Sequence, residues 1–156
     1  MIREQLKEAK KACRFMQNVK PEVKNKALKN ISEALIQKSE LIIQENQKDI
    51  AEAKNNGIKE SMVDRLLLNK ERIEAMAKYI LKVIDLQDPI GTLVREIKRP
   101  HGLVIQQIKI PLGVIGVIYE SRPNVTVDIA SLCIKTNNVC VLKGGKEAIH
   151  SNRILV

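Results

Sequence analysis

Before Asp88, hydrophobic residues recur every three or four positions, as they do along one face of an amphipathic helix. The pattern predicts a first helix that ends before Pro21 and a second helix that begins there. Ser39 and Asn69 are expected to cap two further helices, and a short helix is expected around residues 61–68. The apolar positions expected to face the core are Ile2, Leu6, Ala9, Cys13, Met16, Val23, Ala27, Ile31, Leu35, Leu41, Ile42, Ile50, Ile73, Met76, Ala77, Ile80, Val83 and Ile84.

After Gly91 the pattern becomes strand-like. Residues 92–98 and 103–110 are rich in β-branched side chains and flank a turn sequence, Arg99-Pro-His-Gly102, so they predict a β-hairpin with an exposed tip. Residues 114–119 and 139–142 are short, continuous apolar runs, which are typical of strands buried on both faces of a sheet.

A helical segment that begins at Pro123 and closes at Asn137-Asn138 separates these two runs. A strand–helix–strand unit of this kind is typical of an α/β fold with parallel strands. We therefore expect a helical part over residues 1–91, a hairpin over 92–110 and the start of an α/β domain over 111–156. The last of these is expected to be incomplete, because the sequence ends within an apolar stretch.

The net charge of +9 changes this picture little. Basic and acidic residues are interleaved along the helical patterns, as on a solvated face. Two tyrosines and one phenylalanine are too few for a platform that stacks nucleic-acid bases, so nucleic-acid binding is disfavoured. No apolar run has the length of a membrane span, and no secretory signal pattern is found, so a cytoplasmic protein is expected.

The cysteines and histidines suggest no metal site. Cys13, Cys133 and Cys140 form no CxxC pair, and neither His101 nor His150 has the spacing of a zinc ligand. Reduced thiols are expected, with Cys133 and Cys140 in the core.

Two turns follow the carboxyl ends of the two predicted parallel strands, where α/β proteins bind ligands. The first holds Arg122 and Asn124 at the start of a helix, and the second is Lys143-Gly-Gly-Lys146. Together, their cations, backbone N–H groups and glycines suggest a site for phosphate groups. Tight turns with solvated lysines would explain the same residues equally well. Neither turn carries a dinucleotide fingerprint or a Walker motif.

Residues 110–128 (IPLGVIGVIYESRPNVTVD) and 141–152 (VLKGGKEAIHSN) resemble the signature regions of the γ-glutamyl phosphate reductases, members of the aldehyde dehydrogenase superfamily. Residues 46–50, 64–66 and 88–91 resemble that family in order and spacing. The resemblance spans essentially the whole chain and implies the N-terminal portion of such an enzyme.

The resemblance implies an NADPH-dependent oxidoreductase of proline biosynthesis that reduces L-glutamate 5-phosphate to L-glutamate 5-semialdehyde through a cysteine thioester. It implies cofactor binding by Lys143, Gly144 and Gly145, with Lys143 at the adenosine ribose, and an oxyanion-stabilising role for Asn124. We add the hypothesis that Arg122 holds the anionic substrate.

The resemblance also carries two expectations about the chain as a whole. The hairpin resembles the family's oligomerisation arm, which implies a homo-oligomer. The family's nucleophilic cysteine lies beyond residue 156, and neither Cys133 nor Cys140 falls at its place, so the chain alone is expected to be inactive. Two alternatives remain: a non-catalytic module that acts in cofactor binding or assembly, and a basic nucleic-acid-binding domain.

Overall fold

The computed structural model describes residues 2–156, and its first half is helical. The helices are α1 (Ile2–Met16), α2 (Pro21–Gln37), α3 (Ser39–Asn55), α4 (Glu60–Leu66) and α5 (Lys70–Asp85). They are followed by β1 (Leu93–Lys98), β2 (Val104–Ile108), β3 (Val114–Ile118), α6 (Asn124–Lys135), β4 (Val139–Lys143), the 3-10 helix η1 (Lys146–Ala148) and α7 (Ile149–Ile154). This order of elements confirms the predicted mixed α/β fold.

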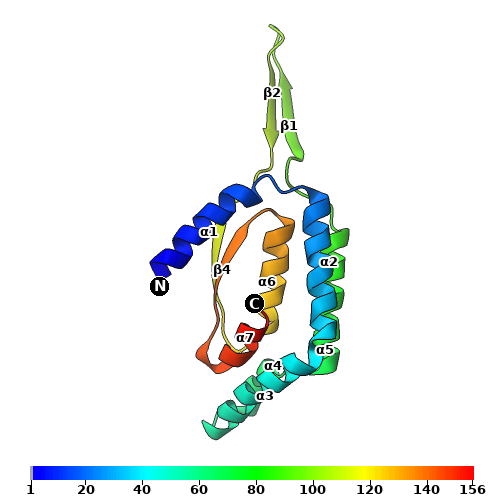
Figure 1. Cartoon of the computed structure of the whole chain (residues 1–156). Helices are drawn as coiled ribbons and strands as arrows, with labels where there is room; N and C mark the ends of the chain where they lie inside the picture. The colour runs from blue at the N-terminus through cyan, green and yellow to red at the C-terminus, as the bar shows by residue number, and fades with distance from the viewer. Residues whose placement is uncertain (1) are drawn as a thin grey trace.

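The main core lies where α2, α5 and α6 pack against one another, with α2 and α5 side by side (Figure 1). Each helix contributes a stripe of apolar side chains to it, as the periodicity predicts. Full burial of one such side chain stabilises the fold by roughly 1.5–3 kcal/mol. The buried members of this core include Leu28, Leu35, Ile73, Met76, Ile80, Val83 and Val127.

The buried face of α2 differs from the predicted one. Val23 was expected to face the core but is 58% exposed, whereas Lys24 and Leu28 are buried. The face with Lys24 points inward because the Lys24 ammonium group has partners there. This group donates a hydrogen bond of 2.9 Å to the carbonyl oxygen of Lys135 and pairs with the Asp88 carboxylate. A buried cation that is paired in this way is compatible with a core position.

Helix α1 lies against β3 and β4, away from the helical core. Ala9 and Cys13 are buried on this side, whereas Ile2 and Leu6, which were expected in the core, are 72% and 47% exposed. The N-terminal end of α1 therefore extends beyond the surface that it covers, and only part of its predicted apolar stripe is used.

The predicted helix caps are right at one position and wrong at another. The Asn69 side chain accepts a hydrogen bond of 2.8 Å from the backbone N–H of Arg72 and so caps α5. Ser39 is instead the first residue of α3, because a single residue, Lys38, separates α2 from α3 and no side chain caps that end.

The hairpin of β1 and β2 projects away from the rest of the chain (Figure 1). Its strands are antiparallel and pair Ile97 with Ile105, and His101 is exposed at the tip, as predicted. Almost every residue of the two strands is exposed, on both faces of the ribbon.

Strands β3 and β4 are parallel, and the register runs from Val114 opposite Val139 to Ile118 opposite Lys143. Helix α6 lies on one side of β4 and α1 on the other (Figure 1). The expectation that β3 is buried on both faces is wrong: its residues alternate, and Ile118 is 78% exposed. Among residues 2–156, only β4 pairs with β3, which explains this exposure.

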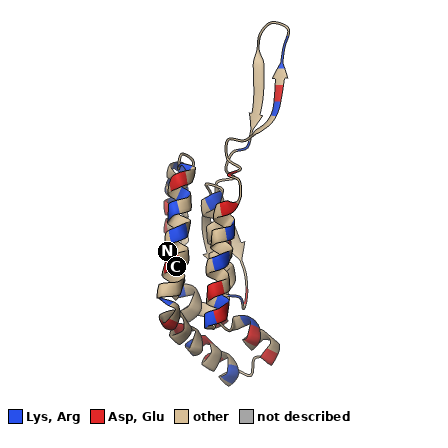
Figure 2. Cartoon of the chain, turned by 90° about the vertical axis from the view of Figure 1, so that its right-hand side faces the viewer, with Lys and Arg blue, Asp and Glu red and all other residues tan. Residues whose placement is uncertain are grey.

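Charged side chains of both signs are interspersed along the helices, as Figure 2 shows. This arrangement matches the solvated faces inferred from the sequence. Within the described part of the chain, no helix combines the length and hydropathy of a membrane span, and no group of three potential metal ligands is found.

Candidate functional site

The turns that follow β3 and β4 are joined by one side chain. Glu147 Oε1 accepts hydrogen bonds from the backbone N–H of Ser121, at 2.6 Å, and from its hydroxyl, at 2.9 Å. Ser121 has a φ of 47°, in the left-handed region that non-glycine residues rarely adopt. The two bonds from Ser121 therefore hold a strained residue immediately before Arg122 and fix the turn on which that side chain stands.

The charge state of Glu147 suits this role. Partial burial alone would raise the pKa of Glu147, but hydrogen bonds from backbone groups and the Ser121 hydroxyl, together with the charge of Lys143, outweigh it and lower the pKa. An ionised carboxylate is the stronger acceptor. The link between the two turns is therefore in place at neutral pH.

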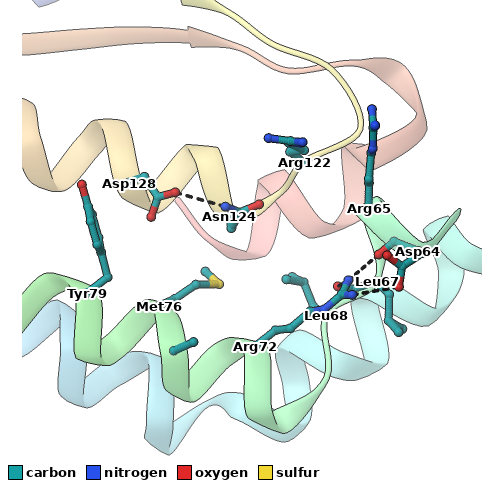
Figure 3. Close-up of a pocket in the computed structure, with 11 residues that line it drawn as sticks. Asp64, Arg65, Leu67, Leu68, Arg72, Met76, Tyr79, Arg122, Asn124 and Asp128 are labelled. Atoms are coloured by element: carbon teal, nitrogen blue, oxygen red, sulfur yellow. Dashed lines mark hydrogen bonds and ion pairs between the residues drawn. The ribbon is translucent and has the colours of Figure 1, made fainter. Parts of the chain in front are cut away.

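A cavity of about 450 Å³ lies between α5 and the start of α6, and we call it the α5–α6 pocket (Figure 3). Two exposed guanidinium groups, those of Arg65 and Arg122, stand at one side of it. Within residues 2–156 these two groups form no hydrogen bond or ion pair. The residues that line the pocket are Asp64, Arg65, Leu67, Leu68, Arg72, Ala75, Met76, Tyr79, Arg122, Asn124 and Asp128.

The third arginine of this pocket, Arg72, is already occupied. It pairs with the Asp64 carboxylate at 2.8 Å and donates a hydrogen bond of 2.9 Å to the carbonyl oxygen of Leu67. Arg72 thus holds the junction of α4 and α5, and Arg65 and Arg122 are the cations that can receive an anion.

Asn124, the predicted oxyanion donor, begins α6 and lies in the same pocket (Figure 3). Its side-chain amide donates a hydrogen bond of 3.1 Å to Asp128 Oδ2, one helical turn further on. A side-chain amide has two N–H bonds, so one remains for a ligand. Burial raises the pKa of Asp128 despite this hydrogen bond.

The three predicted cofactor residues line a different cavity, of about 630 Å³, which we call the β4 pocket. Lys143, Gly144 and Gly145 border it together with two further cations, Lys146 and Arg153. The two turns therefore border separate cavities: the first lies at the α5–α6 pocket and the second at the β4 pocket. The Ser121–Glu147 contact joins the two turns.

The two glycines of the second turn are explained by the protein's own side chains. A β-carbon on Gly144 would lie 2.2 Å from Asn152 Nδ2, and one on Gly145 would lie 2.1 Å from Glu147 Oε1. Asn152 is itself held by the hydroxyl of Thr126, which donates to it at 2.9 Å. The glycines admit these side chains, so the structure does not require a ligand to explain them.

No protein-family model matches the chain. Individual proteins do: a γ-glutamyl phosphate reductase of Geobacillus sp. (strain WCH70) is 52% identical over 153 residues, and one of Halothermothrix orenii is 48% identical over 151 residues. These matches cover 98% and 97% of this chain and 36% of each relative.

Solved structures agree. The γ-glutamyl phosphate reductase of Thermotoga maritima superposes with a TM-score of 0.95 at 41% identity, over 97% of this chain and 37% of that one. The Saccharomyces cerevisiae enzyme gives a TM-score of 0.92 at 36% identity, over 96% of this chain and 38% of that one.

The chain is homologous to one portion of the γ-glutamyl phosphate reductases. A probable aldehyde dehydrogenase from Listeria monocytogenes shares the fold alone, with a TM-score of 0.70 at 17% identity over 99% of this chain and 31% of that one. The resemblance stated from residues 110–128 and 141–152 is thereby confirmed, and so is the aldehyde-dehydrogenase-like fold.

None of the three cysteines lines the α5–α6 pocket, where Arg122 lies. Cys13 and Cys133 are buried, whereas Cys140 is half-buried and borders another cavity with Val127 and Leu142. A hydrogen bond to Cys140 and burial both raise the pKa of Cys133 well above its usual range, so this thiol is a poor nucleophile.

The sequence analysis assigned a role to only one charged residue of the α5–α6 pocket, Arg122, and missed Asp64, Arg65, Arg72 and Asp128. Asp128 follows Asn124 by four positions and so lies on the same face of α6, a spacing that could have revealed it. Arg65 lies within residues 64–66, which resemble the family, but its place beside Arg122 depends on the packing of α4 against its neighbours.

Proposed function

We propose that this chain provides the cofactor pocket and part of the substrate pocket of a reductase that acts on L-glutamate 5-phosphate. Reduction by NADPH with uptake of a proton would yield L-glutamate 5-semialdehyde, inorganic phosphate and NADP⁺. The observation that carries the proposal is the pair of cation-lined pockets joined through Ser121 and Glu147, in a chain homologous to such reductases.

The β4 pocket suits NADP(H). Lys143, Lys146 and Arg153 gather positive charge around it, and phosphate oxygens are the natural partners of lysine and arginine. Lys143 is assigned to the adenosine ribose, and Lys146 and Arg153 to the additional phosphate that distinguishes NADP from NAD. The bound cofactor supplies the hydride, and the chain's part is to bind and orient it.

The α5–α6 pocket suits the substrate. The guanidinium groups of Arg65 and Arg122 match phosphate or carboxylate oxygens in pairs. The remaining N–H bond of Asn124 is available to an oxygen that gains negative charge during the reaction. The exposure of both arginines leaves the pocket accessible to a small molecule.

Three further assignments belong to the same proposal. Reduced thiols and the biosynthetic role favour the cytoplasm. The exposed apolar residues of the hairpin, among them Leu103 and Ile105, favour a homo-oligomer that covers them. We also propose that the 156-residue chain does not turn over alone, because no cysteine lines the pocket that holds Arg122.

The test follows NADPH fluorescence and NADP reduction with the purified chain. NADPH should bind to the unmodified chain. Lys146→Ala should lower the affinity for NADPH about tenfold, which is the cost of one charged hydrogen bond. Lys26→Ala, on the exposed surface of α2, is the control and should leave this affinity unchanged. With glutamate semialdehyde and phosphate, no NADPH should form. Turnover by the chain would contradict the inactive assignment. Absence of NADPH binding would reject the proposed function, and binding alone fits the non-catalytic module as well.

A further inference from the structure

The α5–α6 pocket carries opposite charges at its two sides. Arg65 and Arg122 stand at one side, and the Asp128 carboxylate lies at the other, beside Tyr79 (Figure 3). A site for a plain phosphate or dicarboxylate gains nothing from a carboxylate in its wall, because like charges repel. The Asp128 side chain therefore needs an explanation that the arginines do not give.

The partners of Asp128 leave one of its oxygens available. Oδ2 accepts the hydrogen bond from Asn124, and across residues 2–156 no Lys, Arg or His forms an ion pair with this carboxylate. Asp64, the other acid of the pocket, is by contrast paired with Arg72. Asp128 is half-buried as well, so water compensates its charge only in part.

We propose that Asp128 binds the α-ammonium group of the substrate, while Arg65 and Arg122 bind its anionic groups. The ligand class is then a free α-amino acid that bears a second acidic group. The inference rests on the proposed function, because it names the feature by which the same pocket distinguishes glutamyl substrates from acyl phosphates without an amino group. A desolvated carboxylate discriminates strongly, since a ligand without the ammonium leaves it unpaired.

The experiment titrates the ¹⁵N-labelled chain with L-glutamate, glutarate and N-acetyl-L-glutamate. Glutarate lacks the ammonium at equal chain length, and the acetyl derivative neutralises it. L-Glutamate should bind at least about tenfold more tightly than either, the value of one charge-assisted hydrogen bond. Glutarate binding as tightly as L-glutamate, or no L-glutamate binding at all, overturns the assignment.

Three variants sharpen the test. Asp128→Asn should reduce the affinity for L-glutamate to that for glutarate, because it keeps the shape and removes the charge. Asp85→Asn removes an exposed carboxylate at the end of α5, outside the pocket, and as the charge-matched control it should keep the preference. Arg122→Gln should weaken L-glutamate and glutarate alike. A preference that survives in Asp128→Asn overturns the proposal, and the ligand comparison in the unmodified chain needs no variant to fold.

The outcome is separable from that of the reductase proposal. Failure of NADPH to bind, with the Asp128-dependent preference for L-glutamate intact, would reject the reductase and leave the amino-acid site standing. If NADPH binds and the chain has equal affinity for glutarate and L-glutamate, the amino-acid site is rejected and the reductase proposal stands.

Discussion

The ammonium nitrogen of Lys24 lies 2.5 Å from Asp88 Oδ2, and the Lys24 side chain is 1% exposed. The contact joins α2 to the segment that leads into the hairpin. Lys24 also donates hydrogen bonds to the Asn137 side chain and, at 2.9 Å, to the carbonyl oxygen of Lys135, at the end of α6. One buried cation thus holds three parts of the chain that lie far apart in the sequence.

Replacing Lys24 by methionine is expected to destabilise the fold by about 3–5 kcal/mol, since it leaves partners of a buried charge unpaired. Urea denaturation followed by circular dichroism measures the change in midpoint. Lys26→Met, at an exposed position of the same helix, is the control and should stay within about 0.5 kcal/mol of the unmodified chain. Equal midpoints for the two variants would contradict the assignment.

The same contact predicts a loss of stability in acid. Burial alone would raise the pKa of Asp88, but Lys24, the backbone N–H of Ile90 and the charge of Lys135 outweigh it and lower the pKa from its ordinary value. The contribution of the ion pair is therefore present above about pH 4 and disappears as the pH falls through the lowered pKa. Asp88→Asn should be less stable at neutral pH and lose less on acidification, and parallel pH profiles would argue against this.

Asp128→Asn is expected to raise the melting temperature at pH 7. Burial raises the pKa of Asp128, so its ionised form costs folding free energy at every pH above that pKa. The uncharged amide removes this cost and can still accept the hydrogen bond from Asn124. A gain of about 1–3 °C is expected, and it should vanish near pH 3, where the unmodified carboxyl is protonated. A lower melting temperature at pH 7 would show that the charge stabilises the fold.

Glu147→Ala should weaken ligand binding in the α5–α6 pocket, although Glu147 does not line this pocket. The change removes the acceptor of both Ser121 hydrogen bonds, so the strained turn relaxes and Arg122 loses its fixed position. We expect a loss of about 1–3 kcal/mol in stability and weaker L-glutamate binding. Glu147→Gln keeps an acceptor oxygen and should recover most of both. Full L-glutamate affinity in Glu147→Ala would show that the turn holds without this link.

Local patterns in the sequence predicted the hairpin, the parallel strand pair and the Asn69 cap, because each depends on residues close together in the chain. The buried face of α2 could not be predicted, since the burial of Lys24 depends on its contacts with Asp88 and Asn137, which lie far away in the sequence. The requirement for Gly144 could not be predicted either, because it depends on where the fold places the Asn152 side chain. At the candidate site, the position of Arg122 followed from the strand order, whereas its separation from Lys143 depends on packing.

The projecting hairpin forms an energetic unit of its own. A two-stranded ribbon with both faces in solvent is only marginally stable, and its hydrogen bonds open without unfolding the helices behind it. Amide hydrogens of β1 and β2 should therefore exchange with solvent deuterium much faster than those of α5, whose core residues are buried. Any surface that covers the ribbon would slow this exchange, so the exchange rate directly reports how tightly the ribbon is held.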